Sequence, residues 1–285
     1  MCADAPGRQS PGIRRTTMSH LQNSQYGDSS NFNARLYLHY AFSGNTYPWP
    51  RWVFDRFRKD EYLTVLELGC GNGYLWRLNA DRIPRGWNIA LSDFSEGMLE
   101  AARSGIGNSI AGLSYEVIDA GTIPRDDGSL DMVIANHMLY HVPDRKKAFS
   151  EIRRVLGRDG VFYATTMRDG YMNEMRRIIR DFTAKPAAGE RPNPIIKNFS
   201  IENGGAQLSG YFGRVTLELY ENTLRVTQAG PFVDYAYSLQ GMHGEKSVLE
   251  EHRRDEFLHF IEREIAERGT IHIPSDSGMF TCRQA

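Results

Sequence analysis

A short run of glycines between two apolar segments is the feature of this sequence that most constrains its fold. Residues 65–76 read Val-Leu-Glu-Leu-Gly-Cys-Gly-Asn-Gly-Tyr-Leu-Trp: an apolar stretch with one acid, glycines at alternate positions, then large apolar side chains at helical spacing. Glycine adopts positive φ angles at little cost and lets a ligand approach the backbone closely. The pattern predicts a strand, a tight turn open to a ligand, and a helix.

Short apolar strands and amphipathic helices alternate after this turn. Helices are expected to begin at Ser95 and at Pro143-Asp144, because Ser and Asp are good helix N-caps. We expect further strands at 88–92, 113–118, 130–135 and 161–165. This alternation predicts an α/β fold with a mostly parallel sheet, helices on both faces, and ligands at the carboxyl ends of the strands.

The pattern is less regular beyond residue 166. We expect a linker rich in proline at 185–194 and a final strand at 270–281 that is interrupted around residues 274–278. The remaining segments predict helices at 171–182, 201–212, 232–239 and 248–268, and strand structure at 215–226.

The first 57 residues divide into two parts of different composition. Residues 1–30 are rich in Ser, Gly, Pro, Asn and Gln, which predicts a flexible arm, and Met1 and Met18 are both candidate starts. Residues 33–57 are crowded with aromatic and apolar side chains. Either a pair of helices covering one edge of the core or a lid over a ligand accounts for them. We therefore expect one domain over 31–285, with 33–57 as its N-terminal element.

The overall charge argues against an anionic polymer as the main partner. The chain has 34 Lys and Arg residues against 35 Asp and Glu residues, a formal net charge of −1, so no nucleic-acid partner is expected. Its three cysteines are too few and too scattered for a disulfide framework or a zinc cluster. No apolar run approaches the roughly 20 residues that span a bilayer, and the N-terminus lacks a signal-peptide core. We expect a soluble, cytoplasmic protein with no membrane partner.

Two common nucleotide-binding motifs fit the glycine turn poorly. The dinucleotide fingerprint G-x-G-x-x-G needs its third glycine one position after Gly73, where Tyr74 stands instead. A phosphate-binding P-loop needs Gly-Lys-Ser/Thr, which is absent from the turn.

The series Glu67-x-Gly69-x-Gly71-x-Gly73 resembles motif I of the class I S-adenosylmethionine-dependent methyltransferases, in particular their type 11 and type 25 domains. The likeness in motifs covers residues 60–166. The resemblance implies a Rossmann-like seven-stranded sheet whose last strand is reversed. It also implies S-adenosylmethionine as the cofactor and S-adenosylhomocysteine as the product.

The same resemblance assigns cofactor contacts after successive strands. Asp93 stands where the family places the acid that holds the ribose hydroxyls, and Asp119 stands where an acid contacts the adenine amino group. Residues 136–141, Asn-His-Met-Leu-Tyr-His, follow the fourth strand as they do in these domains. The cofactor-binding set implied in this way is Glu67, Gly69, Cys70, Gly71, Gly73, Asp93, Phe94, Met98, Asp119, Ala120 and Asn136.

Physical chemistry gives the acids and the cysteine separate roles. Carboxylates suit a ligand with hydroxyl and amine donors, although for Asp93 or Asp119 alone a strand-end cap or a surface charge is the commoner role. An acid inside an apolar strand is costly unless it is paired, so we expect a partner for Glu67, such as the ammonium group of the cofactor or a water that bridges to it. Cys70 lies inside the glycine turn with no base beside it and is expected to be structural.

Two histidines follow the fourth strand. His137 and His141 have an i, i+4 spacing that binds zinc on some helices, but no Glu follows His137 and no third ligand is evident, so no metal is expected. His141 is the candidate general base because the pKa of histidine lies near neutrality. Tyr140 beside it is a candidate for orienting the substrate, and packing is the alternative role for both.

The binding site for the methyl acceptor is expected to be formed by segments outside the methyltransferase motifs. Tyr40, Tyr47, Trp49 and Trp52 are the candidates for substrate contact, through cation–π attraction to a sulfonium, stacking on an acceptor ring, or exclusion of water. The helical additions at 171–212 and 229–268 are expected to form a substrate cap.

Together these features favour methyl transfer to an oxygen, nitrogen or carbon atom of a small molecule, for example a secondary metabolite, by a monomer or homodimer. An in-line displacement depends mainly on the positioning of the reactants, so a general base is optional. One alternative is a protein or RNA acceptor, for which the basic cluster Arg176, Arg177, Arg180 and Lys185 is the only hint, unless this is a solvated helix face. The other alternative is a protein that binds the cofactor without transferring its methyl group.

Overall fold

The computed structural model describes residues 30–183, 195–239 and 249–284. Nearly all of the expected N-terminal arm and the expected linker at 185–194 lie outside these residues. Within them, no helix is both long enough and apolar enough to cross a membrane.

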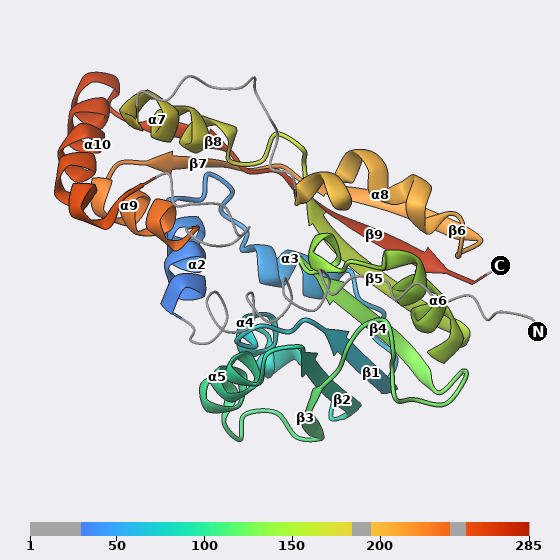
Figure 1. Cartoon of the computed structure of the whole chain (residues 1–285). Helices are drawn as coiled ribbons and strands as arrows, with labels where there is room; N and C mark the ends of the chain where they lie inside the picture. Colours follow the sequence, from blue (N-terminus) through green and yellow to red (C-terminus); the bar gives the residue numbers. More distant parts are fainter. Residues whose placement is uncertain (1–29, 184–194, 240–248, 285) are drawn as a thin grey trace, which may run out of the picture.

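The central element is a seven-stranded sheet, as the sequence predicts (Figure 1). The strand order is β3-β2-β1-β4-β5-β9-β6, with parallel pairing from β3 through β5. The last strand, β9, is antiparallel to both of its neighbours, which confirms the expected reversal. The strands are β1 Tyr62–Leu68, β2 Gly86–Asp93, β3 Leu113–Val117, β4 Leu130–Asn136, β5 Leu156–Met167, β6 Arg214–Tyr220 and β9 Ser277–Arg283.

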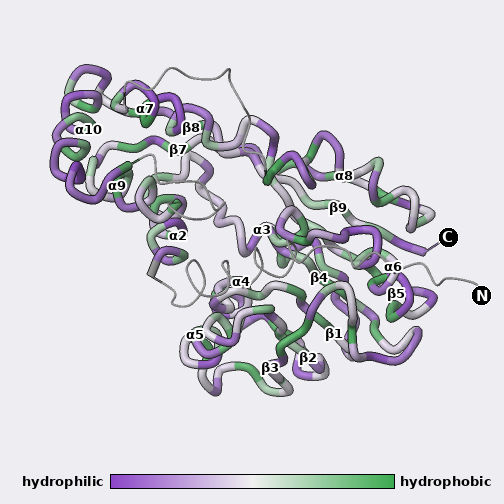
Figure 2. Tube along the Cα trace, in the orientation of Figure 1, coloured by the Kyte–Doolittle hydropathy of each residue, from purple (hydrophilic) through white to green (hydrophobic). Residues whose placement is uncertain are grey.

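Helices cover both faces of this sheet. One face packs against α3 Trp49–Asp55, α4 Tyr74–Arg77 and α5 Glu96–Ile106, and the other against α6 Arg145–Val155 and α8 Ile201–Leu208. Both predicted N-caps are present, since the side chains of Ser95 and Asp144 accept backbone N–H bonds at the starts of α5 and α6. Hydrophobic residues run along the central strands in Figure 2, as expected for strands that are buried on both faces.

Two strands continue beyond the sheet into a second, smaller ribbon. β6 pairs with β9 as far as Tyr220 opposite Ser277, and β7 Thr223–Val226 pairs with β8 Ile271–Pro274 from Thr223 opposite Pro274. The segment expected as one strand at 215–226 is therefore shared between two sheets. The ribbon β7–β8 extends from the carboxyl end of β6, which is the end of the parallel sheet where ligands are expected (Figure 1).

Hydrogen bonds hold the junction between the two ribbons. The backbone N–H of Asn222 donates to Asp276 Oδ1 at 2.9 Å, and the backbone N–H of Ser275 donates to the carbonyl of Asn222 at 2.9 Å. Arg168, at the end of β5, donates to Asp276 Oδ2 at 3.1 Å. Ser43 donates its hydroxyl to Asn222 Oδ1 at 3.1 Å. The junction thus has defined partners from two other parts of the chain.

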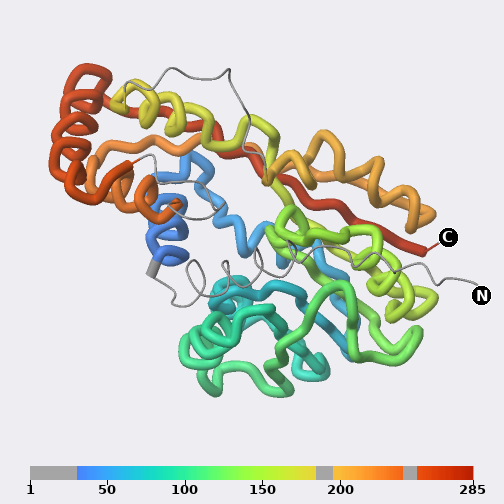
Figure 3. Tube along the Cα trace, viewed as in Figure 1, coloured from blue at the N-terminus to red at the C-terminus, as the bar shows by residue number. Residues whose placement is uncertain are grey.

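The ribbon β7–β8 is the centre of a compact unit that we call the cap. It consists of this ribbon, α2 Ser30–Phe42, α7 Asn173–Thr183, α9 Ala229–Ser238 and α10 Arg254–Arg268. The cap has its own hydrophobic core, in which Leu38, Phe232 and Phe257 are fully buried. The N-terminal helix α2 lies beside α9, which is far away in the sequence (Figure 3).

Three boundaries differ from the sequence-based expectation. Helix α8, within the segment expected to form the cap, lies on β6 and β9 because Leu208 belongs to the core of the main sheet. Helix α10 begins at Arg254, after a 3-10 helix at Glu251–Arg253 that follows the extended backbone of Glu250. Strand β5 begins at Leu156, which pairs with Leu130 across an irregularity in the register.

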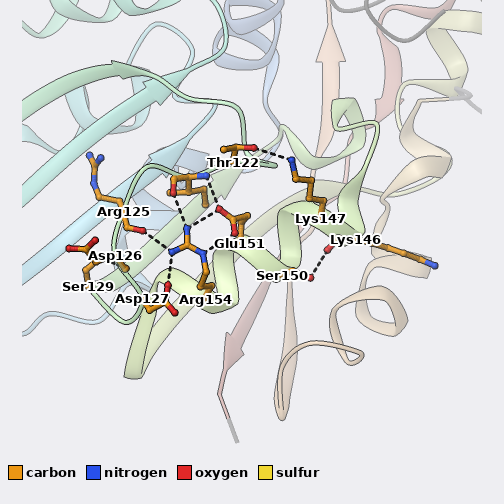
Figure 4. Close-up of polar contacts among 11 residues, drawn as sticks. Thr122, Arg125, Asp126, Asp127, Ser129, Lys146, Lys147, Ser150, Glu151 and Arg154 are labelled. Carbon is orange, nitrogen blue, oxygen red and sulfur yellow. Dashed lines mark hydrogen bonds and ion pairs between the residues drawn. The ribbon is translucent and has the colours of Figure 1, made fainter. Parts of the chain in front are cut away.

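A polar network fixes the loop between β3 and β4 against α6 (Figure 4). The guanidinium of Arg154 donates to the carbonyls of Ile123 and Arg125 at 2.9 and 2.8 Å and to Asp127 Oδ1 at 2.7 Å. Glu151 bonds the same guanidinium and accepts the backbone N–H of Ile123. The bond from Arg154 lowers the pKa of Glu151 to about 2, so the network is ionised at neutral pH.

Replacing Gly204 by Ala should destabilise the protein. Helix α8 lies so close to β9 that a Cβ at Gly204 would be 2.7 Å from Phe280 Cε2 and 3.0 Å from Phe199 Cζ. Such overpacking costs about 1–3 kcal/mol. Gly205→Ala is the matched control, because its Cβ would be at an ordinary 3.5 Å from Phe280 Cε1, and it should be neutral or stabilising by up to about 1 kcal/mol. Equal free energies of unfolding in urea for the two variants would contradict this packing.

Candidate functional site

The glycine turn has the backbone conformation that its sequence predicts. Gly69, Gly71 and Gly73 have φ angles of 70°, 55° and 72°, the left-handed region that side chains disfavour. Space for a side chain is also restricted. A Cβ added to Gly69 would lie 2.7 Å from Met138 Cβ, and one added to Gly73 would lie 2.7 Å from Ile106 Cδ1. Two independent constraints therefore require glycine at the first and third positions.

Asp93, at the end of β2, holds the turn from the neighbouring strand. Its Oδ2 accepts the backbone N–H of Gly71 at 3.0 Å, and its Oδ1 accepts that of Ser95 at 2.9 Å. Burial raises the pKa of Asp93, and these N–H bonds oppose the rise. Each carboxylate oxygen can accept a second hydrogen bond, so Asp93 retains acceptor capacity for a ligand.

Glu67 has its partner inside the protein. The side chain is 1% exposed, and its carboxyl accepts a hydrogen bond from the indole Nε1 of Trp76, on the helix that follows the turn. Burial raises the pKa of Glu67 to about 8, with a further contribution from the charge of Asp93. The buried acid thus connects the strand and the helix on either side of the glycines.

The N-terminal helix α2 covers the glycine turn of its own chain. The Asn72 side chain donates to Asn33 Oδ1 at 3.0 Å, and a Cβ at Gly71 would lie 3.2 Å from the ring of Phe32. Helix α3, the second half of the 33–57 segment, instead packs on the sheet through Val53. The segment is therefore a pair of helices with different positions, one at the turn and one on the core.

A single cavity of about 1430 Å³ connects the glycine turn with the cap. Most of its wall comes from the ends of β1, β2 and β4, from α2, and from the inner side of the cap. The expected site residues that line it are Tyr40, Trp49, Gly69, Cys70, Gly71, Asp93, Phe94, Asp119, Ala120, Asn136, Tyr140 and His141.

Five expected site residues do not line the cavity. Met98 is fully buried in α5, and the Tyr47 hydroxyl donates to Asp55 on the surface. Trp52 stacks on Trp49, with ring centroids 5.2 Å apart, so it supports a lining residue from behind. The full set outside the cavity wall is Glu67, Gly73, Met98, Tyr47 and Trp52.

The loop after β4 contributes polar groups to the cavity. The Thr165 hydroxyl donates to Asn136 Oδ1 and accepts the backbone N–H of His137 at 2.9 Å. His137 has a φ of 52°, and its ring lies 5.1 Å from that of Trp49. Burial lowers the pKa of His137 to about 3, with a contribution from His39, so the imidazole is neutral at pH 7.

The cap supplies lining residues that sequence reasoning missed. The hydroxyl of Tyr171 and Nε2 of His39 are hydrogen-bonded at 2.7 Å, and the ring of Tyr235 lies edge-on to His39 at 5.9 Å. Burial lowers the pKa of His39 to about 4. A signal for part of this set was present, since residues 32, 35, 36 and 39 share one helix face. Two of them, Arg35 and His39, are polar, so this face does not show the apolar periodicity of a buried helix face.

Arg176 also lines the cavity. From the sequence, Arg176 was expected to belong either to a basic face that binds a macromolecule or to a solvated helix face. Its neighbour Arg177 is instead on the surface, paired with Glu174 and Asp181 at 2.6 and 2.9 Å. Within the basic cluster, Arg176 thus lies at the cavity and Arg177 on the surface, and Lys185 lies outside the described residues.

The structure also bears on whether Cys70 can act as a nucleophile and whether the site can hold a metal ion. Burial, together with the charges of Glu67 and Asp93, raises the pKa of Cys70 well above its usual value, so the group is a thiol at neutral pH. Among residues 30–183, 195–239 and 249–284, no group of three or more His, Cys, Asp or Glu side chains is arranged to hold a metal ion.

Comparison with known proteins gives a consistent result for the central part of the chain. A family model described as a methyltransferase domain matches residues 66–164. The malonyl-[acyl-carrier protein] O-methyltransferase of Geobacter sulfurreducens is 34% identical over 116 residues, which are 41% of this chain and 43% of that protein. The mitochondrial arginine-hydroxylase NDUFAF5 of Rattus norvegicus is 26% identical over 191 residues, 67% of this chain and 52% of that protein. The chain thus spans about half the length of these curated relatives.

Solved structures share the fold. Haemonchus contortus phosphoethanolamine N-methyltransferase 2, solved in complex with S-adenosyl-L-methionine, aligns with a TM-score of 0.57 at 17% identity. The alignment covers 94% of this chain and 60% of that one, so it includes cap elements as well as the main sheet.

Replacing Glu67 by Gln should change how stability depends on pH. Because the folded pKa of about 8 exceeds the ordinary value of 4.5, the native state binds this proton more tightly than the unfolded state. Stability contributed by the group is therefore lost as the pH rises from 4.5 through 8. Gln keeps an acceptor for the Trp76 indole but does not ionise.

The measurement is the melting temperature from pH 6 to pH 9. The melting temperature of Glu67→Gln should rise relative to that of the wild type as the pH rises. Glu100→Gln, at an exposed position on α5, serves as the control. Parallel curves for the wild type and Glu67→Gln would contradict a buried acid with a raised pKa.

Proposed function

We propose that this chain is a class I S-adenosylmethionine-dependent methyltransferase and that it transfers the cofactor's methyl group to a small molecule; the match to a methyltransferase domain over residues 66–164 supports the proposal. The acceptor atom is an oxygen, nitrogen or carbon nucleophile. The observation that carries the proposal is the single cavity that the glycine turn, Asp93 and Asp119 share with the cap. Such a recess suits a small acceptor rather than an extended polymer.

The residues present fit the cofactor. The Asp93 carboxylate accepts backbone N–H groups and retains acceptor capacity, which suits the ribose hydroxyls. Asp119 has an exposed carboxylate at the same wall, suited to the adenine amino group, and Phe94 is 37% exposed there and offers a ring face to the base. Gly69 and Gly71 line the cavity without a side chain, so the amino-acid part of the cofactor can approach their backbone closely.

The protein's contribution to the reaction is mainly positioning. When bound, S-adenosylmethionine supplies a methyl group already activated by a sulfonium. The residues of this chain hold the two reactants in line, which is the largest part of catalysis for such a displacement. Asn136, fixed by Thr165, and the loop to His141 border the space where the cofactor end meets the acceptor end.

The acceptor side of the proposal uses the cap. Tyr40 and Trp49 line the cavity with aromatic rings, which favour contact with a cationic or aromatic group. Tyr140 and His141 lie on the same wall as candidates for orienting the acceptor and taking its proton. The cap, including α2 over the glycine turn, is proposed to exclude water and to select the acceptor.

The direct test is incubation of the protein with methyl-labelled cofactor and a cell extract. Label in low-mass products supports the proposal. Label on protein or RNA would assign the activity to a macromolecular acceptor. Binding of the cofactor with no labelled product would favour a protein that does not methylate, an outcome that the hydroxylase name of one relative makes worth excluding.

Replacing Asp93 by Ala should weaken binding of S-adenosylhomocysteine by about 1–3 kcal/mol, the usual value of hydrogen bonds to a charged group. The loss combines the ribose contacts with the bonds that hold Gly71 and Ser95. Calorimetric titration measures it, and Glu100→Ala, at an exposed position on α5, is the control. Unchanged affinity in Asp93→Ala would mean that the ribose lies elsewhere.

A further inference from the structure

The charges in the cavity are divided between its two ends. Among the described lining residues the only carboxylates are Asp93 and Asp119, both at the glycine-turn end. The cations are Arg35 and Arg176 from the cap and Lys197 from the segment before α8. Among the residues that the structure describes, the acceptor end is therefore lined by cations and by no acid.

Arg176 is the most informative of these cations because of what surrounds it. Its guanidinium donates to Asn173 Oδ1 at 3.0 Å and forms no ion pair within the part of the chain that the structure describes. Burial lowers its pKa, and the groups that oppose this are the hydroxyls of Tyr171 and Tyr235, which are neutral at pH 7 because burial raises their pKa values. A partly buried cation without a counter-ion is unfavourable unless a ligand supplies one.

Acids are available on the same helix but are used elsewhere. Glu174 pairs with Arg177 and with Arg268 of α10, and Asp181 pairs with Arg177. The arrangement leaves Arg176 as the arginine of α7 that lines the cavity. A solvated helix face does not explain a guanidinium in this position.

The rest of the acceptor end is largely apolar or aromatic. Leu36, Met172 and Leu239 line it together with the rings of Tyr171 and Tyr235. Such a wall binds a hydrocarbon or aromatic body, whereas a guanidinium binds carboxylate or phosphate oxygens through two parallel hydrogen bonds.

Building on the proposed function, we propose that the methyl acceptor is an organic anion, with an apolar body under the cap and a carboxylate or phosphate group bound by Arg176. The anionic group lies at the cap end, and the nucleophile points toward the glycine turn. Arg35, which donates to the carbonyl of Ser238 at 3.0 Å, lines the same end and adds to its positive potential.

The test uses three probes of the same shape and different charge: 2-naphthoate, 2-naphthyl phosphate and the neutral 2-naphthamide. Each is titrated into the full chain by calorimetry, with and without S-adenosylhomocysteine. The variants are Arg176→Gln, the charge-conserving Arg176→Lys, and Arg180→Gln, which removes a charge from the same helix outside the cavity wall. Melting temperatures confirm that each variant is folded.

The wild type should bind at least one anionic probe more tightly than the amide. Arg176→Gln should weaken that anion at least about tenfold and leave the amide unchanged. The anion affinity of Arg176→Lys should lie between those of the wild type and Arg176→Gln, because lysine keeps the charge but not the paired hydrogen bonds. The anion affinity of Arg180→Gln should stay within about threefold of the wild type. The ratio of naphthoate to naphthyl phosphate affinity distinguishes a carboxylate acceptor from a phosphate acceptor.

Equal binding of the anions and the amide by the wild type would overturn the proposal, as would anion binding that does not change in Arg176→Gln. If Arg176→Gln fails to fold, Arg176→Lys decides between the same outcomes. Failure of the proposed function is seen separately, as an absence of labelled low-mass product from methyl-labelled cofactor, and the titrations without S-adenosylhomocysteine still report on the anion site.

Discussion

The conformation of one turn determines where everything else in this molecule lies. The three glycines after β1 hold φ angles near 55–72°, and they do so because Asp93 accepts the Gly71 N–H from the next strand and α2 closes over the turn through Phe32. Below the turn, Glu67 joins the strand to the following helix through Trp76. The result is a backbone surface held by defined contacts at the carboxyl end of the parallel sheet, where Gly69 and Gly71 line the cavity.

The cap lies across the cavity from this turn, and the sheet itself determines the position of the cap. Strands β6 and β9 do not end at the edge of the sheet but continue, after a hydrogen-bonded junction at Asn222 and Asp276, as β7 and β8. The cap's hydrophobic core is built around this extension. A short break in two paired strands thus places an independent core opposite the glycine turn and forms a cavity with two chemically different ends.

The parts of the structure that depend on local sequence were predictable. Residue types at fixed spacings predict the glycine conformations and the helix N-caps at Ser95 and Asp144. The family resemblance predicts the reversed last strand. The parts that depend on distant contacts were not. The split of residues 215–226 between two sheets requires a partner strand more than forty residues away. Likewise, the burial of Arg176 beside Tyr171 and Tyr235 arises only when α7 and α9 meet in the cap.

A crystal structure with S-adenosylhomocysteine bound tests the central claim most directly. The account predicts the ribose hydroxyls within hydrogen-bond distance of the Asp93 carboxylate, the adenine beside Asp119, and the sulfur facing the space under the cap. A ligand bound in another place, or a sulfur that faces away from the cap, would contradict the claim that this one cavity holds both reactants.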